Sequence, residues 1–158
     1  MIRSMEQLLD TGSGEEILAA LQASLQRSDE SPFWAEKVMP LGRALLSVLL
    51  PLREQGLLFD PEGVTFERLE AGLFLRWCDL MCLKHLAFIL QASNRGAALQ
   101  RTKHTPQQAA AYEPIDLELL GSYLSSYGID LHNEYADFPI THYNLHTGIS
   151  CIIKNLLG

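Results

Sequence analysis

The sequence predicts a single all-α domain, covering residues 1–158, with about five to seven helices. Three observations lead to this class. Apolar residues recur at steps of four, three, four, three and four over residues 34–52, which places them on one face of a long helix. Apolar and polar residues nowhere alternate over a run rich in β-branched residues, and the chain has no Asn-Gly or Asp-Gly turn. Residues typical of helix starts, Ser13 with Glu16 and Ser31 with Pro32, precede two of the apolar runs.

The first two helices are predicted from their caps. A short amphipathic turn is expected over residues 5–9. Ser13 and Glu16 then form a capping box, in which each side chain satisfies a free backbone N–H of the helix start. Ser31 and Pro32 suit the N-cap and first position of the long second helix. Pro40 lies inside its pattern and predicts a kink or a break there, and Gly56 predicts the end of the helix.

The second half of the chain is predicted to hold the central helix. Residues 60–63 are typical of a turn. A third helical region is expected from about residue 65 to residue 93, interrupted at Gly72 and buried because it is apolar nearly all round. Residues 94–114 are expected to be a mobile connection with a short helix at 106–111, followed by helices over 115–126 and from 138 or 139 to the end. The predicted core includes Trp34, Leu45, Val48, Trp77, Leu80 and Met81.

Composition and charge limit the kinds of partner. The net charge is −7, so bulk electrostatics do not draw the chain to nucleic acid, and a DNA contact would have to be local. The sequence has a local basic cluster, which is the predicted partner-binding patch; the alternative is a solvated linker. The cluster consists of Arg95, Arg101, Lys103 and His104.

Cysteines and charges also limit the compartment. Three cysteines do not make a disulfide framework, and buried thiols in a reducing compartment fit best. The longest apolar segment, residues 69–90, carries Arg76, Asp79, Lys84 and His85, which are too many polar groups for an isolated membrane span. We therefore expect a soluble, cytoplasmic protein without membrane contact in this segment.

Two groups of residues have spacings found in metal sites. Cys78, Cys82 and His85 lie at i, i+4 and i+7, and would share one face of a helix. His142 and His146 lie four apart, but Tyr143 stands where a zinc protease needs Glu. Packing in the core explains both groups more simply, so we predict no metal and no cofactor. A helical metalloprotein using either group stays the alternative.

Catalytic motifs are missing from the sequence. It contains neither GxxxxGK[ST] nor GxGxxG, and it has no GxSxG nucleophile elbow. We therefore expect no enzymatic activity from this chain by itself.

Several segments in order resemble the helical insertion of type IV coupling proteins, the TraD/DotL-like ATPases of conjugation and type IV secretion. Residues 31–37, Ser-Pro-Phe-Trp-Ala-Glu-Lys, are similar to the aromatic–Trp entry into a long helix in that family. Residues 52–56, Leu-Arg-Glu-Gln-Gly, are similar to the end of that helix. Residues 11–25, 119–128 and 141–158 resemble the preceding helix, a later helix end and the helix that returns to the motor.

The resemblance implies a recognition function. In that family an all-α domain interrupts a RecA-type motor, faces the cytoplasm and contacts the relaxosome or the secreted substrate, while the parent chain is anchored at the inner membrane. Because the Walker motifs are absent, this chain would be a domain cut from a longer ATPase, and residues 94–114 match no part of the family pattern. The alternative is a free-standing acidic helical adaptor or chaperone that masks an apolar helix of a partner.

Overall fold

The computed structural model describes residues 3–28, 31–91, 99, 102–128 and 140–157, and over these ranges the chain is all-α. Its extended backbone pairs there at one isolated bridge, between Phe59 and Thr65. None of the helices in the described part is long and apolar enough to cross a membrane. Eight helices are described: α1 Met5–Thr11, α2 Gly14–Arg27, α3 Pro32–Gln55, α4 Ala71–Arg76, α5 Leu80–Leu90, α7 Pro106–Ala111, α8 Glu118–Ser125 and α9 Ile140–Leu157.

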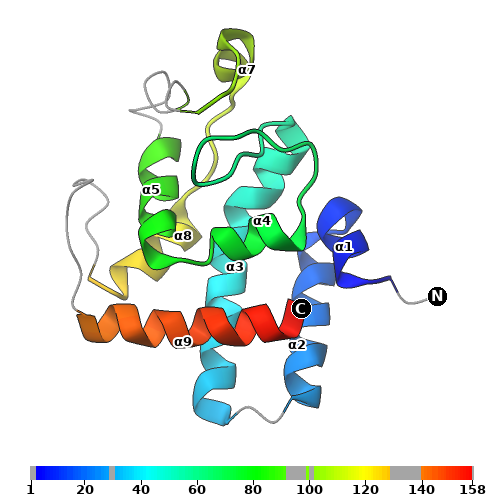
Figure 1. The fold of residues 1–158 in the computed structure, drawn as a ribbon, viewed down its shortest axis with the longest axis vertical. Helices are drawn as coiled ribbons and strands as arrows, with labels where there is room; N and C mark the ends of the chain where they lie inside the picture. The colour runs from blue at the N-terminus through cyan, green and yellow to red at the C-terminus, as the bar shows by residue number, and fades with distance from the viewer. Residues whose placement is uncertain (1–2, 29–30, 92–98, 100–101, 129–139, 158) are drawn as a thin grey trace.

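Helix α3 is the element on which the others assemble. Helix α2 lies antiparallel beside it, α8 packs on another side, and α9 crosses both α2 and α3 (Figure 1). Helix α5 contacts α8 and α9, and α1 contacts α2 and α4. The buried side chains of α3 point to more than one side, as this arrangement requires: Val38, Leu41, Ala44, Leu45, Leu46, Val48, Leu49 and Leu52.

The start of α2 and both ends of α3 are where the sequence predicts them, and α1 runs two residues beyond the predicted turn over residues 5–9. Ser13 and Glu16 exchange hydrogen bonds of 3.0 and 3.1 Å in the predicted capping box. Ser31 occupies the N-cap of α3, although its side chain makes no capping hydrogen bond. Gly56 ends α3 in the left-handed conformation, with φ of 71°, which glycine adopts without steric cost. The predicted break at Pro40 is absent, and α3 runs on through Pro40 and Pro51.

The helical region predicted over residues 65–93, with an interruption at Gly72, is two helices that separate after Arg76, so eight helices are described instead of five to seven. Helix α4 begins only at Ala71, and Gly72 lies inside it rather than at an interruption. The chain breaks after Arg76, and Asp79 starts α5 by accepting a hydrogen bond of 3.2 Å from the backbone N–H of Cys82. A carboxylate at an N-cap stabilises a helix start, so the second helix begins after Asp79, one of the four polar residues of this apolar run.

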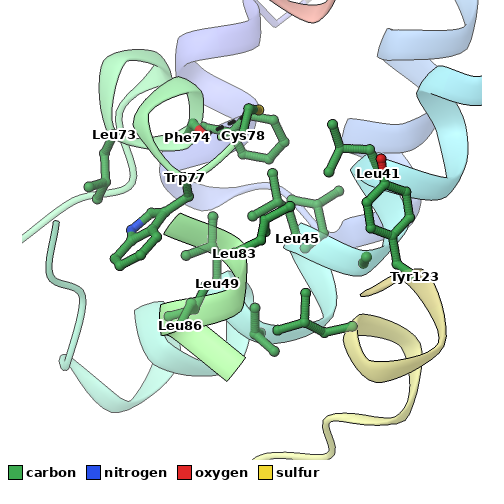
Figure 2. Close-up of a cluster of buried hydrophobic side chains, with 14 of the residues drawn as sticks. Leu41, Leu45, Leu49, Leu73, Phe74, Trp77, Cys78, Leu83, Leu86 and Tyr123 are labelled. Atoms are coloured by element: carbon green, nitrogen blue, oxygen red, sulfur yellow. Dashed lines mark hydrogen bonds between the residues drawn. The ribbon is translucent and has the colours of Figure 1, made fainter. Parts of the chain in front are cut away.

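One part of the core lies between α3, α4, α5 and α8 (Figure 2), and buried side chains of α1, α2 and α9 continue it. Trp77 is buried there and donates its indole N–H to the carbonyl of Phe59 at 2.9 Å, with the two rings edge to face at 5.5 Å. Of the predicted core, Leu45, Val48 and Leu80 are also buried. Met81 is 38% exposed, so its assignment to the core was wrong. It lies one residue after buried Leu80 and therefore on another side of α5.

Long-range polar contacts fix the N-terminal segment and the turn. Arg53 of α3 donates to the carbonyls of Leu9 and Gly12, both at 2.8 Å, and so holds the end of α1. Asp60 accepts from two backbone N–H groups of its own turn and pairs with Arg76 of α4 at 2.6 Å. These bonds satisfy carbonyl and N–H groups that the helix ends and the turn leave open.

Trp34 is partly buried and packs against α9 at Gly148. A Cβ atom at residue 148 would lie 2.7 Å from Cη2 and 2.8 Å from Cζ3 of Trp34, which is closer than two carbons can approach. The absence of a side chain at this position thus allows α9 to cross α3 at the Trp34 ring.

This contact predicts that Gly148→Ala lowers the free energy of unfolding by about 1–2 kcal/mol, because overpacking outweighs the higher helix propensity of alanine. Gly72→Ala is the matched control, since a Cβ atom there meets nothing within 4 Å. The control should be neutral or stabilising. Urea unfolding measures both, and equal effects of the two substitutions would contradict the contact with Trp34.

Candidate functional site

The predicted basic cluster is only partly within the described residues. Arg95 and Arg101 lie outside them, so the cluster as a whole stays a prediction. The Lys103 side chain is exposed, and its backbone N–H donates to the carbonyl of Gly63 at 2.8 Å. Lys103 is thus held beside the turn at residues 60–63, with its charge free to face a partner.

His104 contributes to packing more than to a charged patch. Its Nε2 lies 2.9 Å from the carbonyl of Leu57, its Nδ1 contacts the hydroxyl of Thr102, and its ring meets Phe59 edge to face at 5.4 Å. Burial lowers the pKa of His104, which favours the neutral ring. Two further residues of the predicted connection over residues 94–114, Leu99 and Tyr112, are fully buried.

Cys78, Cys82 and His85 do not share the helix face that their spacing predicts. Helix α5 begins at Leu80, so Cys78 lies in the break before it. The Cys78 thiol is buried and donates to the carbonyl of Phe74, Cys82 is half-buried, and the His85 side chain is exposed. The expectation of one face was wrong because the sequence does not continue as a single helix through Asp79.

The break before α5 instead leaves the Cys78 carbonyl available to α9. His146 is 1% exposed and its Nε2 contacts this carbonyl, while the Ser150 hydroxyl donates to it at 2.9 Å. The other ring nitrogen of His146 lies 2.9 Å from the Tyr123 hydroxyl, which lies 3.3 Å from the Tyr127 hydroxyl. A buried carbonyl without a partner is costly, so these side chains stabilise the junction of α4, α5, α8 and α9.

The hydrogen bonds place a proton on one nitrogen of His146. A carbonyl only accepts, so Nε2 carries a proton towards Cys78. In the neutral ring Nδ1 is then an acceptor, and it shares the single Tyr123 proton with the Tyr127 hydroxyl. Burial lowers the pKa of His146, although the bond to the Cys78 carbonyl opposes this. Burial and the neighbouring Tyr127 hydroxyl raise the pKa of Tyr123. Both shifts favour the neutral forms, and all three side chains are buried, which suits a structural network better than acid–base catalysis.

Metal ligation finds no support in the described geometry. No three His, Cys, Asp or Glu side chains among the residues that the structure describes are placed to hold an ion. His142 lies on α9, but its side chain is outside the described set. His146, its neighbour one turn on, uses both ring nitrogens within the core.

A pocket between α3 and α8 was not anticipated from the sequence. Its volume is about 320 Å³, and we call it the α3–α8 pocket. The adjacent pair Leu119 and Leu120 could have indicated the pocket from the sequence. Neighbouring residues of a helix point in different directions, so one of these two leucines had to face outward. Leu120 is buried and Leu119 is 53% exposed. The pocket is lined by Pro40, Arg43, Ala44, Leu119, Ser122, Tyr123 and Ser126.

No family model, no curated protein and no solved structure matches this chain.

The three thiols are expected to differ widely in reactivity, because the thiolate is the reacting form. Burial raises the pKa of Cys78 to about 12, and burial together with Asp79 raises the pKa of Cys82 to about 11. Cys151 is exposed on α9. With iodoacetamide at about pH 8, we expect Cys151 to be alkylated first, Cys82 slowly and Cys78 only in urea. Peptide mass spectrometry measures the order, and rapid native labelling of Cys78 would contradict its burial.

The buried histidine predicts a loss of stability in acid. Because burial holds the pKa of His146 below its ordinary value of 6.5, the unfolded chain binds this proton more readily than the native state. The contribution to stability is complete above about pH 6.5 and is lost as the pH falls from there towards the native pKa. Urea unfolding at about pH 7.5 and about pH 5.5 should show the decrease.

His146→Gln removes the titrating group and should make this decrease smaller. His104→Gln is the comparison, because burial lowers the pKa of that histidine as well. An unchanged pH dependence in the His146 variant would assign the effect to other groups.

Proposed function

We propose that this chain is a non-catalytic recognition domain of a type IV coupling protein. It would bind a relaxosome component or a secreted substrate on the cytoplasmic side and present it to a RecA-type motor in the same chain, which is anchored at the inner membrane. A DNA contact would use the basic cluster around Lys103.

The observation that supports this proposal is that residues 31–37 and 52–56, which carry the resemblance, connect helices of the fold. They lie at the two ends of α3, and both ends join other helices. At the start, Trp34 packs on Gly148 of α9, the helix that corresponds to the return to the motor. At the end, Arg53 holds the carbonyls of Leu9 and Gly12, and Gly56 stops the helix. Because these residues determine how several helices pack together, their resemblance supports a relation between this whole domain and the helical insertion of coupling proteins.

The buried polar groups also favour recognition over catalysis. Trp77, His104, His146 and Arg53 each bond a backbone carbonyl, so their polar atoms are used to hold the fold. A rigid helical scaffold of this kind suits presentation of a surface.

The alternative function, an acidic adaptor or chaperone, is supported by exposed apolar side chains. Phe33 is 57% exposed and Leu119 is 53% exposed, on a chain with a net charge of −7. Such side chains could cover an apolar helix of a partner without any motor.

Sequencing the gene on both sides of this segment separates the two functions. The proposal expects a GxxxxGK[ST] loop upstream and a Walker B strand downstream in the same reading frame. In-frame stop codons at both ends would overturn the coupling-protein assignment and leave the adaptor. As a check at the protein level, a photo-crosslinking residue at position 33 should capture a relaxase or a secreted substrate in cells that carry the transfer system.

A further inference from the structure

The α3–α8 pocket is hollow because short side chains form its floor. Pro40 and Ala44 lie one turn apart on α3, and neither fills the space towards α8. The ring of Tyr123 forms a wall, and Leu119 lies at the pocket with about half of its surface in water. The pocket of about 320 Å³ is large enough to take one large apolar side chain.

Arg43 gives the pocket a positive charge. It is exposed, and within the described part of the chain no carboxylate pairs with it. Arg3, Arg53 and Arg76 each have a glutamate or aspartate partner, whereas Arg27 and Arg68, like Arg43, have none among the described residues. An unpaired arginine beside an apolar pocket on an acidic protein favours a partner that brings its own carboxylate.

One face of α3 joins the pocket to the exposed ring of Phe33. Phe33, Lys37, Pro40 and Ala44 follow steps of four, three and four, so they share one face of the helix. Lys37 lies over the exposed ring of Phe33, with its Nζ 4.7 Å from the ring centre. From residue 33 to residue 44 this face is about 16 Å long, which corresponds to roughly three helical turns.

From this geometry we propose that the α3–α8 pocket and the adjoining face of α3 bind an acidic amphipathic helix of a protein partner. An apolar side chain of that helix enters the pocket, a second covers Phe33, and carboxylates on its flank pair with Arg43 and Lys37. A helix satisfies its own backbone groups, whereas a peptide that binds as an added β-strand needs an open strand edge. This inference rests on the proposed recognition function and adds where the partner binds and what chemistry it has.

The probe is a fluorescein-labelled synthetic helix of about 18 residues, with Leu along one face and Glu on both flanks. Fluorescence anisotropy at low salt should show saturable binding to the full chain. The same helix with Lys in place of Glu should bind at least about tenfold more weakly, because it meets Arg43 and Lys37 with like charge. Equal binding of the two helices would overturn the acidic specificity, and no binding of the Glu helix would overturn the site.

Two pairs of variants locate the contact. Ser122→Trp places a large ring in the pocket, and Ser125→Trp places it at an exposed position of α8 that does not line the pocket. We expect at least about a tenfold loss of affinity for the first and a change within about twofold for the second. Arg43→Glu should weaken binding about fivefold or more, and Arg68→Glu, the same charge change at an exposed arginine outside the pocket, should not.

The Arg43→Glu protein should in turn regain affinity for the Lys helix, which distinguishes a charge contact from a general loss of structure. Thermal unfolding of all four variants checks that they remain folded. If none of the four variants changes the affinity, the helix binds elsewhere and this inference is overturned. The gene-context test would still decide the proposed function. Sedimentation of the free protein tests the other occupant: a dimer that Ser122→Trp dissociates would assign this face to a second copy of the chain.

Discussion

The burial of α3 on several sides at once is the constraint on which the rest of the structure depends. Helix α2, α8 and α9 all contact it, so its side chains must alternate between three neighbours along its length. The length of α3 is set locally, by Pro32 at its first position and Gly56 after its last residue. Pro40 is exposed, so its ring lies towards solvent, and burial of the remaining surface offsets the missing backbone hydrogen bond.

Much of the fold could be predicted because its signals are local. The Ser13 capping box and the glycine stop at residue 56 act within one turn of the chain, so neighbouring residues suffice to find them. The break before α5 was hidden because apolar residues continue on both sides of it. Asp79 was the available signal, but a carboxylate in an apolar run is equally compatible with a helix surface. Tertiary packing decided between the two.

The candidate surface could be predicted less well, because it depends on which residues two distant helices bring together. The basic cluster near Lys103 was found because its charges are close in sequence. Arg43, by contrast, is separated by about 80 positions from Leu119 and Ser122, and no period connects them. His146 likewise has spacing typical of a metal ligand, yet its partner is a carbonyl released by a helix break that the sequence did not reveal.

Arg53 has a consequence for how the molecule opens. Its guanidinium joins the carbonyls of Leu9 and Gly12 to a residue more than 40 positions later in the chain, at the far end of α3. Helix α1 has seven residues, too few to persist alone in water. Its amide protons are therefore protected from exchange with solvent only while its contacts with α2, with α4 and with Arg53 persist. Unwinding of the last turn of α3 removes the Arg53 contact, so it lowers the protection of a helix that lies far away in the sequence.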